Sequence, residues 1–381
     1  MKIAINLLPF KEWAGGMVTY IHNLLYQFGR IAPNHQFYIF TREQVLPHFK
    51  FSYPNFVYFP MPIKMRAIFK RIVFEQLQFG FILDAHKIDV LFNPTPSGPQ
   101  LWRGKQVTAI HDCAYDRFPE EALTKFHRIY YKIIFPSTIK KSTYILTVSN
   151  FSKKELEEVY GVRPEKIKVI YEGPPRLPQV DNQEIEKLFS KFKIEKPYFL
   201  FVSNQQPRKN VVRLVKAFYL LKKEKKINDL LVLTGHRDEK RVEPFIKKEL
   251  NELHKEIIFA GVVTRKELVA LYKKSICLVF PSLYEGFGLP VLEAQSLGVP
   301  VLTSNVTSLP EVAGKGALFV NPYDVEDIAR GMYRIATDKE LREKLIQEGF
   351  ENIKRFSWEK AAKELLKVFE EVYYEKNSPN K

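Results

Sequence analysis

Two glutamates eight positions apart, with glycines between them, are the residues whose types and spacing point most clearly to chemistry. Glu285 and Glu293 bracket Gly286 and Gly288, and residues 277–280 upstream form a short apolar run. This pattern predicts a buried strand, a glycine-rich loop and a helix start. Such a junction offers backbone N–H groups and the positive end of a helix dipole to an anion. Because glycine lets the backbone approach a ligand closely, we expect an anion site here.

The two carboxylates indicate what else the ligand carries. They would repel a lone phosphate, whereas sugar hydroxyls donate hydrogen bonds to carboxylates. The helix is expected to begin near Leu289, with Pro290 in its first turn, so that Glu293 points from the helix toward the ligand. A ligand with phosphates at one end and sugar hydroxyls at the other is a nucleotide sugar. An ordinary strand–turn–helix with two solvated glutamates is the alternative, because a Gly-x-Gly pair alone is a weak signal.

Three further places carry candidate residues near expected strand ends. Gly15 and Gly16 precede the first expected helix, His111 ends a strand, and Arg208 with Lys209 lies between a strand and a helix. Two fixed positive charges near a helix start suit a diphosphate leaving group. A histidine at a strand end can hydrogen-bond a sugar hydroxyl. A structural histidine and a solvated basic turn are the alternatives.

Other positions carry weaker signals. Val263, in the turn after residues 257–260, is either backbone lining for a base ring or part of an ordinary turn. The eight histidines are scattered, and the chain has neither an HExxH motif nor a paired-cysteine motif. We therefore expect no metal site.

The elements that must position these residues alternate along the chain. Short apolar runs separated by helical patterns predict an α/β protein with parallel sheets. Strands are expected at residues 3–8, 37–41, 56–59, 90–93, 107–111, 145–149, 167–171, 198–203, 230–234, 257–260, 277–280, 299–303 and 318–320. Besides the helix from Leu289, helices are expected at residues 18–29, 66–86, 122–137, 152–160, 211–223, 325–337, 339–354 and 358–374, with one more between 234 and 257.

Length and linker composition predict two domains. The chain has 381 residues, too many for one ordinary core, and residues 173–178 read Gly-Pro-Pro-Arg-Leu-Pro, unlike a helix or a strand. We expect two doubly wound parallel-sheet domains on either side of this linker. Ligands bind outside the carboxyl ends of such sheets, so a shared cleft is expected.

The composition of the chain limits the kinds of binding partner and the cellular compartment that we expect. The net charge of +16 is spread along the chain, and no nucleic-acid-binding module or aromatic-interleaved basic stripe occurs, so no nucleic-acid partner is expected. Cys113 and Cys277 lie far apart in apolar, strand-like contexts, which predicts a reducing compartment. With no signal peptide and no apolar run of ~18 residues, we expect a cytoplasmic protein.

One basic segment has two alternative interpretations. In residues 64–74, Phe69, Val73 and Phe74 recur at helical spacing beside Lys70 and Arg71. Such a helix lies either on an anionic membrane or on an ordinary protein surface. Peripheral attachment at the inner face of the cell membrane is therefore an open alternative.

Taken together, these residues resemble the retaining glycosyltransferases of family four, which have the GT-B fold. The resemblance runs along nearly the whole chain and is most specific at residues 285–293, which match the Glu-x7-Glu motif with its Glu-Gly-Phe-Gly-Leu-Pro core. Other matching segments are residues 15–16, 147–152, 207–210, 259–261, 304 and 308–314. Residues 111–112 with 118–120 are similar to members that act as mannosyltransferases in surface-polysaccharide assembly.

The resemblance implies an architecture. It implies two Rossmann-like doubly wound parallel-sheet domains facing a cleft. Residues 1–175 would form the acceptor-side domain, with the C-terminal helix at 358–381 packing back on it. Residues 176–357 would form the domain that binds the nucleotide-sugar donor.

It also implies roles for the candidate residues. Glu293 would bind the ribose hydroxyls, Glu285 would hold hydroxyls of the transferred sugar, and His111 would contact that sugar near the reacting carbon. Arg208 and Lys209 would neutralise the diphosphate. The remaining donor contacts would be Gly15, Gly16, Asn204, Val263, Gly286, Phe287, Gly288 and Leu289.

One segment departs from the family pattern. Many relatives carry an arginine shortly after the strand that precedes the lysine, whereas residues 203–206 of this chain read Ser-Asn-Gln-Gln. The positive charge of the diphosphate clamp would therefore rest on Arg208 and Lys209.

The implied activity is hexose transfer with retention, without a metal or another cofactor. Mannose from GDP-mannose is the first choice of donor, with a UDP-sugar as the other, and the acceptor would be a glycan or a lipid-linked acceptor in cell-surface polysaccharide synthesis. A non-catalytic polyanion- or nucleotide-binding protein on the same scaffold is the alternative. A dinucleotide oxidoreductase is disfavoured because neither glycine pair has the G-x-G-x-x-G spacing.

Overall fold

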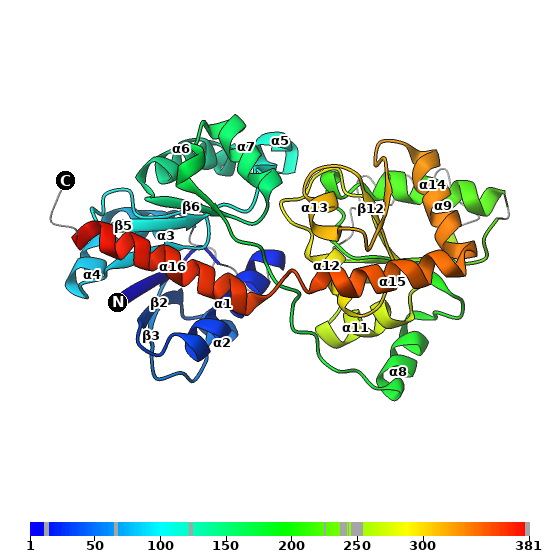
Figure 1. Cartoon of the computed structure of the whole chain (residues 1–381), viewed down its shortest axis with the longest axis horizontal. Helices are drawn as coiled ribbons and strands as arrows, with labels where there is room; N and C mark the ends of the chain where they lie inside the picture. The colour runs from blue at the N-terminus through cyan, green and yellow to red at the C-terminus, as the bar shows by residue number, and fades with distance from the viewer. Residues whose placement is uncertain are drawn as a thin grey trace. The chain divides into compact units, whose positions relative to one another are not determined.

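The chain folds into two compact units. The computed structural model describes residues 1–10, 15–64, 68–121, 125–224, 226–236, 242, 244 and 254–377. Unit 1 comprises residues 1–173 and 357–381, and unit 2 comprises residues 174–356. Each unit is built on its own parallel sheet (Figure 1).

Unit 1 contains a seven-stranded sheet in the order β3-β2-β1-β4-β5-β6-β7, and every neighbouring pair is parallel. The strands are β1 Lys2–Asn6, β2 Gln36–Arg42, β3 Phe56–Met61, β4 Val90–Asn93, β5 Lys105–Ala109, β6 Tyr144–Thr147 and β7 Ile167–Val169. The strand order reverses between β1 and β4, and the loops that leave such a switch point diverge.

The helices of unit 1 include one from the end of the chain. They are α1 Gly15–Ile31, α2 Leu46–Phe49, α3 Ile68–Leu77, α4 Phe79–Ala85, α5 Ala114–Arg117, α6 Lys125–Lys141, α7 Asn150–Tyr160 and α16 Trp358–Asn377, with 3-10 turns η1 Pro119–Glu121 and η2 Pro164–Lys166. Helix α16, red in Figure 1, packs beside α1. Its fully buried Phe369 lies 6.2 Å from the ring of Phe28 and 5.5 Å from that of Phe92. The last helix therefore completes the first unit's core.

Unit 2 contains a six-stranded parallel sheet in the order β10-β9-β8-β11-β12-β13. Its strands are β8 Tyr198–Phe201, β9 Leu230–Thr234, β10 Ile257–Gly261, β11 Cys277–Phe280, β12 Val301–Ser304 and β13 Leu318–Val320. Its helices are α8 Asn182–Phe192, α9 Val211–Lys223, α11 Arg265–Lys274, α12 Leu289–Ser296, α13 Leu309–Ala313, α14 Val325–Thr337 and α15 Lys339–Ile353, with 3-10 turns η3 Pro207–Lys209 and η4 His254–Glu256.

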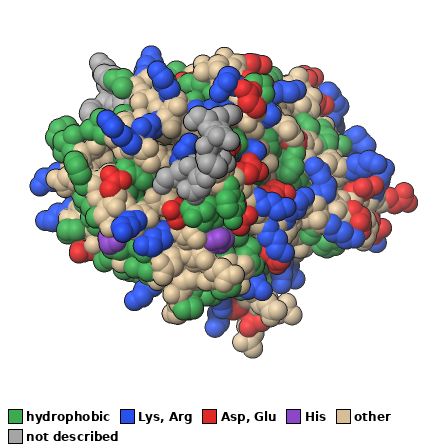
Figure 2. Space-filling view, turned by 60° about the vertical axis from the view of Figure 1, so that its left-hand side comes forward, with side chains coloured by type: hydrophobic (Ala, Val, Ile, Leu, Met, Phe, Trp, Pro, Cys, Tyr) green, Lys and Arg blue, Asp and Glu red, His purple; other side chains and the backbone are tan. Residues whose placement is uncertain are grey.

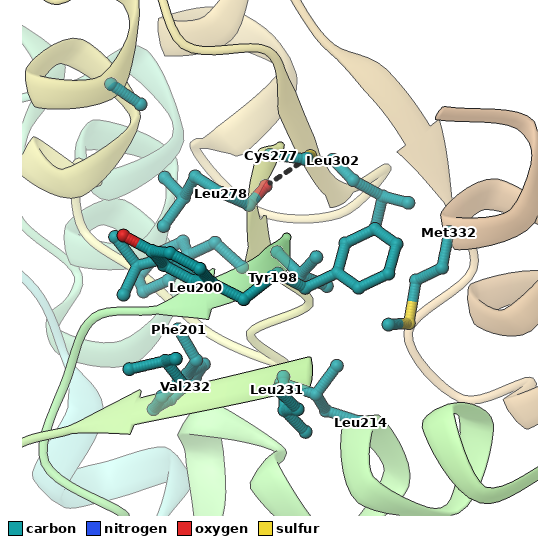
Figure 3. Packing of buried hydrophobic residues seen from close by; sticks show 14 of the residues in the cluster. Tyr198, Leu200, Phe201, Leu214, Leu231, Val232, Cys277, Leu278, Leu302 and Met332 are labelled. Atoms are coloured by element: carbon teal, nitrogen blue, oxygen red, sulfur yellow. Dashed lines mark hydrogen bonds between the residues drawn. The ribbon is translucent and has the colours of Figure 1, made fainter. Parts of the chain in front are cut away.

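The core of unit 2 explains why its strands are continuous apolar runs. Helices cover both faces of a parallel sheet, so both sets of side chains are buried. Leu200 and Leu278 are register partners on the neighbouring strands β8 and β11, whereas Leu231 of β9 pairs with Phe199, whose side chain points to the other face of the sheet. Figure 3 shows Leu231 beside Leu214 of α9, and Met332 of α14 belongs to the same core cluster. The Cys277 thiol is buried in this core, and burial raises its pKa.

The expected strands all coincide with observed strands, and the largest differences concern helices. The helix expected at residues 66–86 is two helices, α3 and α4, that meet at Gln78, where φ is −114°. The turn there brings Phe79 and Leu83 into the core, and a Cβ added at Gly80 would lie 3.3 Å from Trp102. Residues 66–67 lie outside the described residues.

The two longest helices that were not expected from the apolar pattern are α8 and α11. Both begin with a capping box, Asp181 with Glu184 and Thr264 with Glu267. This start signal is readable in a sequence, although short helices carry weak periodicity. Most of the helix expected between residues 234 and 257, and residues 122–124 of another, lie outside the described residues.

One expectation about local context was wrong, and the structure adds detail to the basic segment. Cys113 is buried, as expected, but it precedes the short helix α5 and does not lie in a strand-like segment. In the basic segment, Arg71 turns inward and donates to Glu75 at 2.8 Å, and Phe74 packs against the core, while Phe69 is exposed. No helix in the described part of the chain has the length and apolar character needed to cross a membrane.

Candidate active site

The switch point of the unit 2 sheet brings the charged candidates together. Strand order reverses between β8 and β11, which pair side by side. Arg208 and Lys209 lie in the 3-10 turn that follows β8, and Glu285 lies in the loop that follows β11. Loops from the carboxyl ends of neighbouring parallel strands emerge at one edge, so residues 76 and 77 positions apart in the sequence meet there.

Glu285 is held between two cations. Lys209 Nζ lies 2.5 Å from Glu285 Oε1, and Arg208 Nη1 lies 3.3 Å from Oε2. Burial works to raise the pKa of Glu285, but the charges of Lys209 and Arg208 outweigh it, and the pKa is lowered. With two cations and one carboxylate, the cluster keeps an excess positive charge beside the loop.

Hydrogen bonds fix the glycine-rich loop. Ser308 Oγ donates to the carbonyls of Glu285 and Phe287, both at 2.9 Å. Arg208 Nη1 donates to the carbonyl of Tyr284 at 3.1 Å, and the Arg208 carbonyl accepts from Leu283 N at 2.7 Å. The loop and the basic turn therefore hold one another in place.

Gly288 ends this loop and begins α12. Its φ is +114°, and no side chain caps the helix at this position. A Cβ added at Gly288 would lie 2.8 Å from Leu309 Cδ2, so both backbone conformation and space favour glycine. The helix begins at Leu289 with Pro290 in its first turn, which confirms the expected start.

Glu293 lies on α12 with partners of a different kind. Tyr272 OH donates to its Oε2 at 2.9 Å, and Arg265 Nη1 donates to its Oε1 at 3.1 Å. Burial raises the pKa of Glu293, and the opposing influence of Arg265 and Tyr272 does not cancel this. The two carboxylates of the motif therefore have pKa values shifted in opposite directions.

The remaining unit 2 candidates lie on neighbouring loops. Asn204, after β8, is exposed, and its Oδ1 accepts from the backbone N–H of His236 at 3.0 Å. Val263 follows β10 and packs partly against the core. Gly261, two residues earlier, has φ +68°. These loops leave the carboxyl ends of β8 and β10.

Unit 1 carries the other candidates. Gly15 and Gly16 are exposed at the start of α1, and Gly15 has φ +56°. His111 follows β5, and its Nδ1 lies 3.3 Å from Oε1 of the buried Glu172. The ring of Tyr20 stands edge-on to His111 with centroids 4.5 Å apart.

The structure adds residues that sequence reasoning missed. Arg265 and Tyr272 contact Glu293, and Tyr20 and Glu172 contact His111. Glu172 carried a usable signal, because it is an acidic residue just after an expected strand. Among the described residues, no group of three or more His, Cys, Asp or Glu side chains is placed to hold a metal ion.

Comparison with known proteins identifies the family. The family model described as Glycosyltransferase Family 4 matches residues 14–174, and the one described as Glycosyl transferases group 1 matches residues 182–352. The O-antigen chain mannosyltransferase B of Escherichia coli is 32% identical over 271 residues, which are 70% of this chain and 70% of that protein. The chain belongs to glycosyltransferase family four.

A second relative and a solved structure also match this glycosyltransferase. The serotype-specific mannosyltransferase WbdA of Escherichia coli is 35% identical over 182 residues, which are 47% of this chain but only 22% of that protein. A solved glycosyltransferase from Rickettsia africae ESF-5 superposes with a TM-score of 0.72, covering 97% of this chain and 98% of that one at 19% identity. The two parallel-sheet, Rossmann-like units are thus those of the GT-B fold, as the sequence predicted.

Proposed function

We propose that this glycosyltransferase moves a hexose, with mannose as first choice, from a nucleotide diphosphate sugar to a glycan or lipid-linked acceptor in cell-surface polysaccharide synthesis. The observation that carries the proposal is Glu285 held by Arg208 and Lys209 beside the start of α12. Relatives named as O-antigen chain and serotype-specific mannosyltransferases support the choice of mannose and of a polysaccharide product.

The donor diphosphate would rearrange the charges of this cluster. Phosphate oxygens compete with Glu285 for Lys209 and Arg208, and the positive end of α12 favours the same anion. As the cations turn to the diphosphate, the Glu285 carboxylate becomes available to accept hydrogen bonds from hydroxyls of the transferred sugar. The same two cations then stabilise the negative charge that develops on the leaving diphosphate.

The transfer step is proposed to occur on one face of the sugar. The bond from the anomeric carbon to the diphosphate oxygen breaks, and a bond from that carbon to the acceptor oxygen forms on the same side. The acceptor hydroxyl gives its proton to the leaving diphosphate, which departs as the nucleoside diphosphate. The anomeric configuration is retained.

The other residues are proposed to bind and orient the donor. Glu293 accepts hydrogen bonds from the ribose hydroxyls, and the loop from Gly286 to Leu289, with Asn204 and Val263, completes the unit 2 contacts. In unit 1, proposed as the acceptor-side unit, His111 meets the transferred sugar, and Gly15 and Gly16 approach the phosphates.

We propose that no metal or other cofactor takes part, because Arg208, Lys209 and the α12 dipole supply the positive charge that a diphosphate needs. Addition of EDTA should leave the initial rate of transfer unchanged. A loss of activity with EDTA that Mg²⁺ or Mn²⁺ restores would overturn this part of the proposal.

We also propose that the enzyme is cytoplasmic and meets an anionic membrane through unit 1. Leu77, Phe81, Leu101 and Ile133 are each more than half exposed. Their segments are joined, because Gln100 N donates to Gln76 Oε1 at 3.0 Å and Ser137 Oγ donates to Gln100 Oε1 at 2.6 Å. Figure 2 shows hydrophobic side chains interspersed with basic and acidic ones on the forward face. Exposed apolar side chains on a protein of net charge +16 suit an anionic lipid surface.

Vesicle flotation tests the membrane proposal. Vesicles containing an anionic lipid should carry the protein upward at low salt and less of it at high salt, whereas neutral vesicles should not. Phe81→Ser should reduce flotation, and Tyr323→Ser, at an exposed aromatic of unit 2, should not. Equal flotation with neutral and anionic vesicles, or none with either, would refute the proposed surface.

A transfer assay tests the main proposal. Wild-type protein is incubated with GDP-mannose or UDP-sugars and a glycan acceptor, and nucleoside diphosphate release is followed. Glu285→Ala should lower the rate by at least about 100-fold, while Glu343→Ala, at an exposed glutamate on α15, should not. Normal turnover by Glu285→Ala would exclude the proposed role, and nucleotide binding without transfer would favour a non-catalytic nucleotide-binding protein.

A further inference from the structure

The nitrogen atoms of His111 have contrasting surroundings. Nδ1 lies 3.3 Å from the Glu172 carboxylate, whose side chain is only 3% exposed. Nε2 is buried and has no hydrogen-bond partner within the described part of the chain. Glu172 follows β7 and His111 follows β5, so the carboxyl edge of one sheet brings together residues that are far apart in the sequence.

The imidazole ring is held in this orientation by its neighbours. Tyr20 packs edge-on against it at an interplanar angle of 81°, and Trp358 packs against Tyr20 with ring centroids 6.0 Å apart. The backbone of His111 is fixed as well, because Ser152 Oγ donates to its carbonyl at 2.8 Å. These contacts place the ring with Nδ1 toward Glu172 and Nε2 away from it.

We propose that Glu172 is a positioning residue that acts through His111. A neutral imidazole carries one hydrogen, and a carboxylate can only accept, so Glu172 selects the tautomer with the hydrogen on Nδ1. Nε2 is then left with a lone pair that accepts a hydrogen bond from a hydroxyl of the transferred sugar. The inference rests on the proposed function, because that function supplies the hydroxyl.

The choice of glutamate over glutamine is the testable core of this inference. A glutamine of the same shape can offer either its carbonyl oxygen or its NH₂ group to Nδ1, so it permits both tautomers. Glu172→Gln therefore keeps the packing but removes the selection. A merely structural role for Glu172 would survive this substitution.

Two measurements on the full-length protein test the inference. Imidazole ¹H–¹⁵N correlation at pH 8, with the His111 signal assigned by its absence in His111→Ala, should show hydrogen on Nδ1 in the wild type and a mixture of tautomers in Glu172→Gln. The same variant should lower kcat by about tenfold or more, the size of effect seen for carboxylates that orient metal-bound histidines, while the donor KM stays within about twofold. In a His111→Ala background, Glu172→Gln should lower kcat no further.

A matched control distinguishes an effect of Glu172 on the His111 tautomer from a general loss of stability. Glu155 is a buried carboxylate of the same unit whose Oε1 lies 2.6 Å from Arg117 Nη2. Glu155→Gln should leave the His111 tautomer and kcat unchanged.

Three results would overturn the inference. These are hydrogen on Nε2 in the wild type, an unchanged tautomer in Glu172→Gln, and equal loss of kcat from Glu172→Gln with and without His111. If the tautomer responds as expected but the wild type transfers no sugar from any donor, the proposed function fails, and the pairing of Glu172 with His111 still stands.

Discussion

The two glutamates of the Glu-x7-Glu motif lie in opposite electrostatic settings. Glu285 is kept ionised by Lys209 and Arg208, whereas burial raises the pKa of Glu293. A carboxylate paired with cations can exchange them for a diphosphate, and a buried carboxylate gains from polar hydroxyls that replace lost solvation. We infer that the two carboxylates suit two different rings of one ligand, Glu285 the transferred sugar and Glu293 the ribose.

The raised pKa of Glu293 predicts a specific pH dependence of stability. Between the unfolded-state pKa, about 4.3, and the higher folded-state pKa, the folded protein binds more protons than the unfolded chain. Its free energy of unfolding therefore falls through this window as pH rises. Glu293→Gln removes this contribution, so the variant should gain stability relative to wild type as pH rises from about 4 to 8. Urea unfolding across this range measures it.

The matched control for this prediction is Glu343→Gln, at an exposed position. Its stability relative to wild type should change little with pH. A difference between Glu293→Gln and wild type that stays constant from pH 4 to 8 would show that Glu293 is not destabilised in its ionised form.

At the scale of elements, the loop between β11 and α12 depends on one glycine conformation. Gly288→Ala must place a Cβ at φ +114° and 2.8 Å from Leu309 Cδ2. We expect a loss of stability of about 1–3 kcal/mol and a weaker interaction with nucleoside diphosphate, because the helix start and the loop amides move. Thermal unfolding and isothermal titration calorimetry measure the two effects.

Gly161→Ala provides the comparison. Gly161 also has a positive φ, +61°, but an added Cβ would meet no atom within 4 Å. This variant should lose about 1–2 kcal/mol and keep its affinity for nucleotide. Nucleotide affinity unaffected by Gly288→Ala would contradict the proposed role of the loop.

The sequence predicted strands better than helices, for a physical reason. Strands buried on both faces appear as unbroken apolar runs, and each expected strand is present. The break between α3 and α4 lies where Gly80 approaches Trp102 closely, and it was not visible as periodicity. Side-chain partners were equally hidden, because Glu293 meets Tyr272 and Arg265 from 21 and 28 positions away. Motif spacing locates a site residue, but only the fold assigns its neighbours.

At the scale of the whole molecule, the two units differ in how the chain builds them. Unit 2 is one continuous segment, whereas unit 1 needs α16 from the end of the chain. Phe369→Ala leaves a cavity at a fully buried position between α16 and the unit 1 sheet. It should lower the free energy of unfolding by about 3–5 kcal/mol. We expect calorimetry to show a lower transition for unit 1, while added nucleoside diphosphate raises a separate transition of unit 2. A single transition that moves as a whole would contradict independent cores.

The central claim is that a nucleoside diphosphate group binds at the unit 2 site with Glu293 on its ribose. The most direct test is a thermal-shift panel of GDP, UDP, ADP and NAD on wild type and Glu293→Gln. A ligand at 100 times its dissociation constant stabilises the protein that binds it by about 2.7 kcal/mol. We predict that one nucleoside diphosphate stabilises the wild type and has a much smaller effect on the variant. Stabilisation by NAD alone, by none of the four, or equally in both proteins would contradict the claim.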